Sequence, residues 1–262
     1  MPTIGIFDSG IGGLTVLRAL RHVLPSESYN YLGDTARLPY GSKSPETISR
    51  YLVQNIDFLK HLGVKALVVA CNSASTVLEE DQGLGMPIYG VIRPGARRAL
   101  ATTRTGRIGI LGTRATVLSG AYPAAIHALD PKAEVFQQAC PLLVPLVEEG
   151  WIDDPVTRLV AQRYLACLKE ARVDVIVLGC THYPVVKTLI AELLDESVQL
   201  VDSAIAISDM IRADLASGRI KHADEPGRTR VWTTDVGETF QRVGKMILDP
   251  FTIDEWNLAD IK

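Results

Sequence analysis

Short apolar runs alternate with longer amphipathic stretches along the first part of the chain. Ile4–Phe7, Tyr29–Leu32 and Ala66–Ala70 are short and rich in aliphatic or aromatic residues, as expected of buried strands. In Leu14–Leu24 and Ile48–Leu62, apolar residues recur every three or four positions, which places them on one face of a helix. Ala66–Ala70 is apolar throughout, which is typical of a strand covered on both faces. The pattern predicts repeated βα units with a parallel sheet.

The same alternation continues toward the C-terminus. Further strands are predicted at Ile108–Leu111, Val135–Ala139, Val173–Leu178, Leu200–Val201 and Arg230–Thr233. Further helices are predicted at Pro155–Glu170, Ile205–Ala216 and Glu238–Leu248. The polar stretch His222–Arg228 contains a Pro and a Gly and is expected to be a loop.

Two segments of the first half are echoed in the second half. Ile4-Gly5-Ile6 matches Ile108-Gly109-Ile110, and the apolar run that ends at Cys71 matches the run that ends at Cys180. We therefore predict an α/β fold of two pseudo-symmetric, open parallel-sheet domains. In open α/β sheets, ligands bind at the carboxyl ends of the strands. The active site is expected in the cleft between the domains, with one thiol on each wall.

Composition narrows the range of functions. The chain has 262 residues, a net charge of -3 and a pI near 6.0, which argues against partners such as nucleic acid or a membrane surface. The N-terminus lacks the basic and apolar regions of a signal peptide, and no apolar run approaches the ~18 residues of a membrane span. We expect a cytoplasmic protein whose four cysteines are free thiols.

The neighbours of the two strand-end cysteines favour chemistry over packing. A single strand-end cysteine is better explained as a small buried hydrophobe. Here Asn72-Ser73 follows Cys71 and Thr181-His182 follows Cys180, so both thiols have polar neighbours in equivalent positions. Cys140 and Cys167 lack this setting, and we interpret both as packing residues.

Paired thiols can serve as nucleophiles, metal ligands, redox pairs or proton carriers. The sequence contains neither CxxC nor HExxH spacing, so no metal site is predicted. A redox pair would have to approach within disulfide distance, whereas a substrate cleft holds the sulfurs apart. Nucleophilic catalysis leaves the second thiol unexplained. Proton transfer across one carbon uses both Cys71 and Cys180, one as acceptor and one as donor.

The glycine-rich segment Asp8–Leu14 follows a predicted strand and begins a predicted helix. It matches neither GxGxxG nor GxxxxGK[ST]. One interpretation is a tight βα turn that Asp8 or Ser9 caps. The other is a loop whose backbone N–H groups meet a carboxylate while Asp8 faces an ammonium group or orients a thiol, and an amino acid substrate would satisfy both of these contacts.

Six ordered segments resemble the glutamate racemase family, a part of the aspartate/glutamate racemase superfamily. They are FDSGIGGLTVLRAL at Phe7–Leu20, GDTARLPYGSKS at Gly33–Ser44, ACNSAS at Ala70–Ser75, GTRATVLSGAY at Gly112–Tyr122, LVPLVEEG at Leu143–Gly150 and GCTHYP at Gly179–Pro184. The similarity extends to Arg230–Leu248, near the C-terminus. Ser73 stands where many members have Thr, which keeps the hydroxyl group.

The resemblance implies an isomerase that racemises glutamate without a cofactor or a metal. It implies that Cys71 serves D-glutamate and Cys180 serves L-glutamate. Residues implied to contact the substrate or polarise the thiols are Asp8, Ser9, Tyr40, Gly41, Asn72, Ser73, Thr181 and His182; Asp34, Thr116 and Glu148 are placed in or near the pocket.

The resemblance also implies a wider context. It implies a homodimer that supplies D-glutamate for peptidoglycan, and so for cell wall biogenesis and cell shape. Together with the internal echo, it predicts one lobe of residues 1–95 plus 206–262 that carries Cys71, and a second lobe of residues 96–205 that carries Cys180. Neither the dimer interface nor any effector follows from the sequence.

Three alternatives to a glutamate racemase stay open at this point. A racemase of another acidic amino acid, such as aspartate, would use the same chemistry with a different side-chain pocket. A non-catalytic, two-lobed amino-acid-binding protein would leave the paired thiols without a purpose. A thiol-dependent hydrolase would leave the second cysteine without a role.

Overall fold

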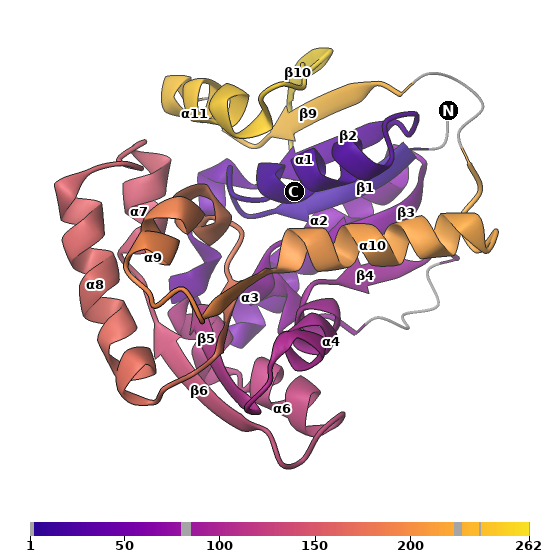
Figure 1. The fold of residues 1–262 in the computed structure, drawn as a ribbon. Coiled ribbons are helices and arrows are strands. Elements are labelled where there is room, and N and C mark those ends of the chain that lie inside the picture. Colours follow the sequence, from indigo (N-terminus) through magenta and orange to yellow (C-terminus); the bar gives the residue numbers. More distant parts are fainter. Residues whose placement is uncertain (1–2, 80–84, 223–226, 236, 262) are drawn as a thin grey trace.

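Two separate parallel sheets form the framework of the protein (Figure 1). The computed structural model describes residues 3–79, 85–222, 227–235 and 237–261. The first sheet has the order β10-β9-β2-β1-β3-β4 and the second has the order β6-β5-β7-β8, with every strand pair parallel. Both sheets are open, so the predicted α/β fold class is confirmed.

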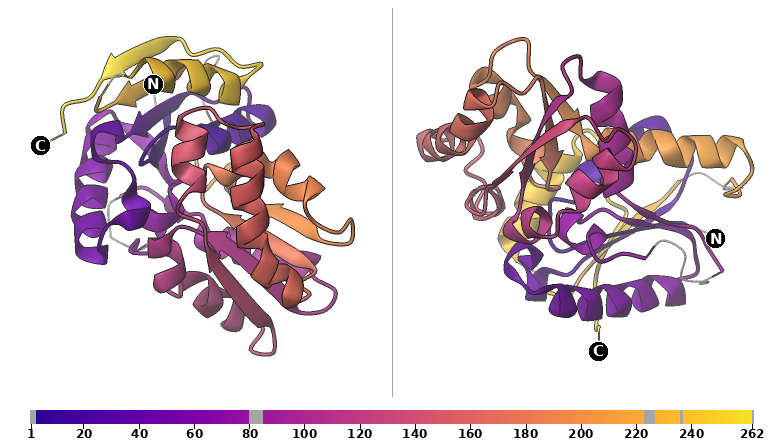
Figure 2. Two further views of the ribbon diagram at one scale, coloured as in Figure 1. Left: turned by 90° about the vertical axis from the view of Figure 1, so that its left-hand side faces the viewer. Right: turned by 90° about the horizontal axis from the view of Figure 1, so that it is seen from below.

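The strands of the first sheet are β1 (Thr3–Asp8), β2 (Tyr29–Gly33), β3 (Val64–Val69), β4 (Ile88–Gly90), β9 (Thr229–Thr233) and β10 (Glu255–Leu258). Those of the second sheet are β5 (Arg107–Gly112), β6 (Glu134–Ala139), β7 (Val175–Gly179) and β8 (Gln199–Asp202). The views in Figure 2 show the second sheet, in magenta to orange, as a body beside the first.

The internal echo in the sequence corresponds to an equivalence in strand register. The order β2-β1-β3-β4 in one sheet repeats as β6-β5-β7-β8 in the other. Gly5 pairs with Leu67 in the first sheet, and Gly109 pairs with Ile176 in the second. In each case a cysteine follows the second residue of the pair by four positions, so Cys71 and Cys180 occupy equivalent strand ends.

Helices cover both faces of each sheet. The helices of the first part of the chain are α1 (Leu14–Val23), α2 (Pro45–His61) and α3 (Asn72–Ser75), with single turns η1 (Thr35–Arg37) and η2 (Tyr40–Ser42). The middle part contains α4 (Ile92–Thr102), α5 (Arg114–Leu118), α6 (Ala121–His127), α7 (Leu143–Glu148), α8 (Pro155–Glu170), η3 (Tyr183–Val186) and α9 (Lys187–Glu192). The last helices are α10 (Ser203–Ala216) and α11 (Glu238–Leu248).

Successive side chains along a strand point to opposite faces of its sheet, so each sheet has a separate hydrophobic cluster on each face. In β3, Val68 packs with residues of α1, α10 and α11, whereas Leu67 and Val69 pack with residues of α2 on the other face. In the second sheet, Ile110 packs with α4 and α6, and Leu111 packs with α7, α8 and η3. A strand buried on both faces needs apolar residues at every position, which explains the continuous runs in the sequence.

The helix α10 connects the two sheets. It begins directly after β8 of the second sheet and packs against α1 and α4 (Figure 1). Asp202 caps it by accepting a hydrogen bond from the Ala204 N–H at 2.8 Å. The strands of the first sheet lie within residues 3–90 and 229–258, and those of the second lie within residues 107–202. The lobe boundaries at residues 95/96 and 205/206 stay a prediction.

The structure corrects the sequence interpretation at one cysteine. Cys167 is exposed on α8, where its thiol donates to Gln138 Oε1 at 3.0 Å, so the interpretation of this residue as a packing residue is wrong. The buried face of α8 carries Ala161, Leu165 and Leu168, and Cys167 lies outside that face. Cys140 is fully buried, so its packing role is confirmed.

Several elements escaped the sequence pattern. The strands β4 and β10 and the helices α3, α4, α6, α7 and α9 were not predicted, whereas α5 was expected after the turn that follows β5. Of the predicted loop His222–Arg228, residues 223–226 lie outside the described residues, and the flanking residues have no regular structure. Within the part of the chain that the structure describes, no helix has both the length and the apolarity to cross a membrane.

Candidate active site

Both strand-end cysteines line one small cavity between the two sheets. Its volume is about 60 Å³. The cavity is lined by Ser9, Pro39, Tyr40, Gly41, Ser42, Cys71, Asn72, Ser73, Thr113, Arg114, Pro141, Val144, Cys180, Thr181 and His182. The structure therefore brings together both predicted thiols and all but one of the residues predicted to contact the substrate, and the exception is Asp8.

Cys71 lies between β3 and α3, with only 5% of its surface exposed. Burial, with the charge of Asp8 as a second cause, raises the pKa of the Cys71 thiol to about 12. The thiol donates a weak hydrogen bond to Ser9 Oγ at 3.7 Å. These surroundings favour the protonated thiol, which is the form that donates a proton.

Cys180 follows β7 and has a different environment. Its Sγ lies 3.8 Å from His182 Nδ1, and His182 Nε2 lies 2.6 Å from Glu148 Oε1. Burial lowers the pKa of His182, but interactions with Cys180 and Glu148 outweigh burial and hold this pKa well above its ordinary value. A protonated imidazole at this distance stabilises negative charge that forms on the sulfur. The two thiols thus differ in their surroundings as a donor and an acceptor would.

Asp8 lies behind the cavity and links the two sheets. Its carboxylate accepts hydrogen bonds from the Gly10 N–H at 3.0 Å and from Thr181 Oγ1 at 3.0 Å. Burial raises the pKa of Asp8, although the charge of His182 and these hydrogen bonds oppose the effect. Because Thr181 stands between Asp8 and the cavity, a direct substrate contact of Asp8 stays a prediction.

The glycines after β1 permit close contact between the two halves of the protein. A Cβ atom on Gly12 would lie 2.4 Å from His182 Nδ1, and one on Gly10 would lie 2.6 Å from Glu148 Oε1. The Ile11 N–H donates to Glu148 Oε1 at 3.4 Å, so the carboxylate that this loop meets belongs to the protein. The Gly10 N–H donates to Asp8 Oδ2 at 3.0 Å, so Asp8 caps the tight turn after β1 as one interpretation predicted, and helix α1 begins after Gly13.

Tyr40 lines the cavity, but its hydroxyl group is held by the protein. The hydroxyl donates to Asp34 Oδ2 and accepts from Asn55 Nδ2 at 3.0 Å. Asp34, which is fully buried, also pairs with Arg37 at 2.7 Å. Asp34 therefore fixes the loop that carries Tyr40 and does not itself line the cavity. Gly41 fits there because a Cβ atom at that position would lie 2.5 Å from Thr113 Cβ.

The sequence interpretation missed part of the cavity wall. Thr113 Oγ1 lies 2.8 Å from Ser73 Oγ, which is a further contact between the two halves. Thr113 also caps α5 by accepting a hydrogen bond from the Thr116 N–H at 3.2 Å. Thr116 is fully buried beneath Thr113 and does not line the cavity. Thr113 follows β5 as Ser9 follows the equivalent β1, so the internal echo contained a signal for this residue.

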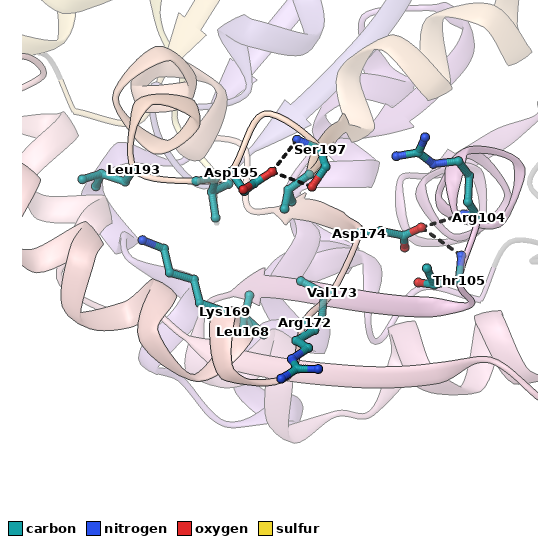
Figure 3. A pocket seen from close by; sticks show the side chains of 12 residues that line it. Arg104, Thr105, Leu168, Lys169, Arg172, Val173, Asp174, Leu193, Asp195 and Ser197 are labelled. Atoms are coloured by element: carbon teal, nitrogen blue, oxygen red, sulfur yellow. Dashed lines mark hydrogen bonds between the residues drawn. The ribbon is translucent and has the colours of Figure 1, made fainter.

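A larger cavity of about 680 Å³ lies elsewhere, at the amino ends of strands of the second sheet (Figure 3). Its walls include Arg104, Lys169 and Asp174. Asp174 precedes β7, and its carboxylate accepts from the Arg104 N–H at 2.7 Å and the Thr105 N–H at 2.9 Å. Ligands of open α/β sheets bind at the opposite, carboxyl ends. The small cavity with two thiols is therefore the candidate active site.

Two open parallel α/β sheets with buried thiols at equivalent strand ends, both on one cavity, are compatible with an isomerase. The sequence profile of the Asp/Glu/hydantoin racemase family matches residues 14–211. A glutamate racemase from Geobacter metallireducens is 50% identical over 94% of this chain and 92% of its own length. The chain belongs to the Asp/Glu/hydantoin racemase family.

Solved structures support the same placement. A glutamate racemase isoform from Bacillus anthracis has a TM-score of 0.94 at 35% identity, covering 100% of this chain and 99% of that chain. A glutamate racemase from Francisella tularensis in complex with D-glutamate has a TM-score of 0.90 at 35% identity, covering 99% of this chain and 97% of that chain.

Proposed function

We propose that this protein interconverts L-glutamate and D-glutamate by moving the α-proton between Cys71 and Cys180. The similarity to glutamate racemases over nearly the whole chain supports the substrate, and one of these relatives is described with D-glutamate bound. The observation that carries the mechanism is that Cys71 and Cys180, from equivalent strand ends, line one cavity.

Each reaction cycle in this mechanism uses both thiols. One cysteine, as the thiolate, removes the α-proton from one face of the substrate and becomes a thiol. The other cysteine, as the thiol, gives its proton to the opposite face and becomes a thiolate. The product has the opposite configuration, and the protonation states of the two cysteines have been exchanged. Cys180 deprotonates L-glutamate, and Cys71 deprotonates D-glutamate. The reaction needs no metal and no cofactor.

Polar groups around the cavity hold the substrate in this scheme. Ser9, Asn72, Ser73 and Thr181 provide hydroxyl and amide groups at the carboxyl ends of strands from both halves. Tyr40 and Gly41 complete the wall, and His182 stabilises charge on Cys180. Asp8 acts through Thr181, to which it is hydrogen-bonded.

The cavity is small, about 60 Å³, and residues from both sheets form its walls. We propose that these walls separate to admit the substrate. We propose that the moving bodies are the predicted lobes, residues 1–95 plus 206–262 and residues 96–205, and that Ser73 and Thr113 lose their contact when these bodies part.

Stereospecific assays of the purified, chelator-treated protein test the activity. L-Glutamate and L-aspartate are incubated separately in deuterated water, and circular dichroism and mass spectrometry follow the loss of optical activity and the incorporation of deuterium at the α-carbon. We expect racemisation and exchange with glutamate in the absence of added cofactor. Racemisation of aspartate in preference to glutamate, or loss of turnover on chelation with recovery on metal addition, would contradict the proposal.

The same proposal places the protein in the cytoplasm as a homodimer that supplies D-glutamate for peptidoglycan. Expression in a bacterial strain that requires external D-glutamate tests this role, because the active protein should restore growth and normal cell shape. A double variant that lacks both Cys71 and Cys180 is the matched control. Light scattering of the purified protein tests the dimer, since one chain has a mass of 28.5 kDa.

A further inference from the structure

Tyr122 joins the wall of the cavity to helix α10. The Asn72 Nδ2 group donates a hydrogen bond to the Tyr122 hydroxyl at 2.9 Å, and this hydroxyl lies 3.1 Å from Ser203 Oγ. Asn72 lines the cavity and begins α3, whereas Ser203 is the first residue of α10. Tyr122 itself does not line the cavity and is fully buried on α6. The Tyr122 hydroxyl group therefore contacts Asn72, a candidate substrate-binding residue, on the side that faces away from the cavity.

The ring of Tyr122 is held from two sides by glycines. A Cβ atom on Gly179 would lie 3.1 Å from Tyr122 Cε2, and one on Gly95 would lie 3.2 Å from both Cε1 and the hydroxyl oxygen. A side chain at either position would press on the ring, so both glycines allow the ring to pack closely against the backbone of β7 and α4. The position of the hydroxyl group is thus set by packing, independently of Asn72.

Among the described residues, the amide oxygen of Asn72 has no hydrogen-bond partner. Burial raises the pKa of Tyr122, so the hydroxyl keeps its proton and can donate it to Ser203 while it accepts from Asn72. Asn72 is 2% exposed, and its Oδ1 is buried with no hydrogen-bond partner among the described residues. An unsatisfied buried acceptor is unfavourable, and a ligand that donates a hydrogen bond would satisfy it.

We propose that Tyr122 is a positioning residue that holds the Asn72 amide so that Oδ1 receives the α-ammonium group of the substrate. This inference rests on the proposed racemisation of glutamate. An amide oxygen only accepts hydrogen bonds, and the ammonium group is the only donor that glutamate carries at neutral pH, because both carboxyl groups are ionised. Fixing the ammonium group on Asn72 restricts rotation about the α-carbon, which directs the α-hydrogen toward one of the two thiols.

Calorimetric titration with two ligands tests this inference. Racemic glutamate is used because a racemase does not change its composition, and glutarate is the same dicarboxylate without the ammonium group. For Tyr122→Phe we expect the Kd of glutamate to rise about tenfold, as loss of one hydrogen bond to a charged group predicts. The Kd of glutarate should stay within about twofold of the wild-type value. If Tyr122 had a merely structural role, Tyr122→Phe would raise the Kd of both ligands by the same factor.

Two further variants make the test specific. Tyr29 is also buried, and its hydroxyl donates to the Leu24 carbonyl at 2.9 Å, away from the cavity, so Tyr29→Phe should keep both affinities. In an Asn72→Ala background, Tyr122→Phe should cause no further loss of glutamate affinity, because the group that it positions is absent.

Equal weakening of glutamate and glutarate binding in Tyr122→Phe would overturn the inference, because the effect would then not depend on the ammonium group. Unchanged affinity for glutamate would overturn it as well. Wild-type protein that binds glutarate but neither binds nor racemises glutamate would overturn the proposed function, and the inference with it. The wild-type measurements thus separate the two kinds of failure.

Discussion

Glu148 Oε1 lies 2.6 Å from His182 Nε2, and this contact joins the end of α7 to the residues that follow β7. The other nitrogen of the same ring lies 3.8 Å from Cys180 Sγ. The Glu148 carboxylate thus holds the His182 imidazole, whose pKa is raised, beside the Cys180 thiol. Among the described residues, no imidazole lies within hydrogen-bond distance of Cys71. This asymmetry leads to the first prediction.

Glu148→Gln should lower kcat/KM by about 10²-fold while the protein stays folded, because glutamine keeps a hydrogen bond to His182 but removes the negative charge that favours the imidazolium. L- and D-glutamate have equal free energies in water, so kcat/KM must fall equally in both directions. An irreversible reaction reveals the asymmetry. With a glutamate analogue that carries a chlorine on the β-carbon, elimination from the L form should slow more than elimination from the D form.

Chloride release from the two analogue enantiomers measures this difference. Glu149→Gln, at the next residue, is the matched control, because no described contact joins the Glu149 side chain to His182. Equal slowing of both enantiomers by Glu148→Gln would show that Glu148 does not act through the Cys180 side of the site.

The free energy of unfolding at alkaline pH should depend on the raised pKa of the buried Cys71 thiol. Its pKa in the folded protein is about 12, above the value of about 8.5 for an unfolded cysteine. Between these two pH values the folded state keeps a proton that the unfolded state loses, so the free energy of unfolding falls as pH rises, by up to about 1.4 kcal/mol per pH unit for this group. Below about pH 8.5 this contribution is fully present.

Urea unfolding of wild-type and Cys71→Ser protein between pH 8 and 11 measures this effect. The serine variant should show a shallower loss of stability with pH, because its hydroxyl group does not ionise in this range. Cys167→Ser, which changes the exposed cysteine on α8, should keep most of the wild-type slope. The same slope in Cys71→Ser and wild type would contradict the assigned environment of Cys71.

Close contact between the two halves should make Gly12 intolerant of substitution. A Cβ atom there would lie 2.4 Å from His182 Nδ1 and 2.5 Å from Thr181 Oγ1, so Gly12→Ala forces these side chains to move. We expect a loss of about 1–3 kcal/mol in the free energy of unfolding and a large loss of racemisation. Gly237→Ala, at a glycine with no atom within 4 Å of the added Cβ position, should keep racemisation, with a cost in stability of only about 1 kcal/mol because alanine is a poor first residue for α11. Thermal unfolding and activity assays of both variants check the expectation.

The parts of the fold that the sequence predicted are those with a strong local pattern. Strands buried on both faces, such as β3, and amphipathic helices, such as α2, need particular residues at every position. The helix α4 was missed because Pro94 and Gly95 are poor helix formers within its first turns. Gly95 is explained only by the fold, since it leaves space for the Tyr122 ring.

The candidate site divides in the same way. The two cysteines could be predicted because each follows a recognisable strand, and the echo made their positions equivalent. The contact between Glu148 and His182 joins residues 34 positions apart on different elements, and no local pattern encodes that distance. Exposure of Cys167 depended on which face of α8 packs against the sheet, which the composition of Leu165-Ala166-Cys167-Leu168 did not decide.

The central claim is that Cys71 and Cys180 each act on one enantiomer from opposite sides of one cavity. The most direct test measures elimination from β-chloroglutamate of each configuration by Cys71→Ser and Cys180→Ser, which releases chloride and an enamine that water hydrolyses to 2-oxoglutarate and ammonium. Elimination needs removal of the α-proton but no reprotonation, and serine is too weak an acid to form the base that removes it. Cys71→Ser should act on the L form alone, Cys180→Ser should act on the D form alone, and neither should racemise glutamate. The same enantiomer preference in both variants, or near-normal racemisation by either, would contradict the account.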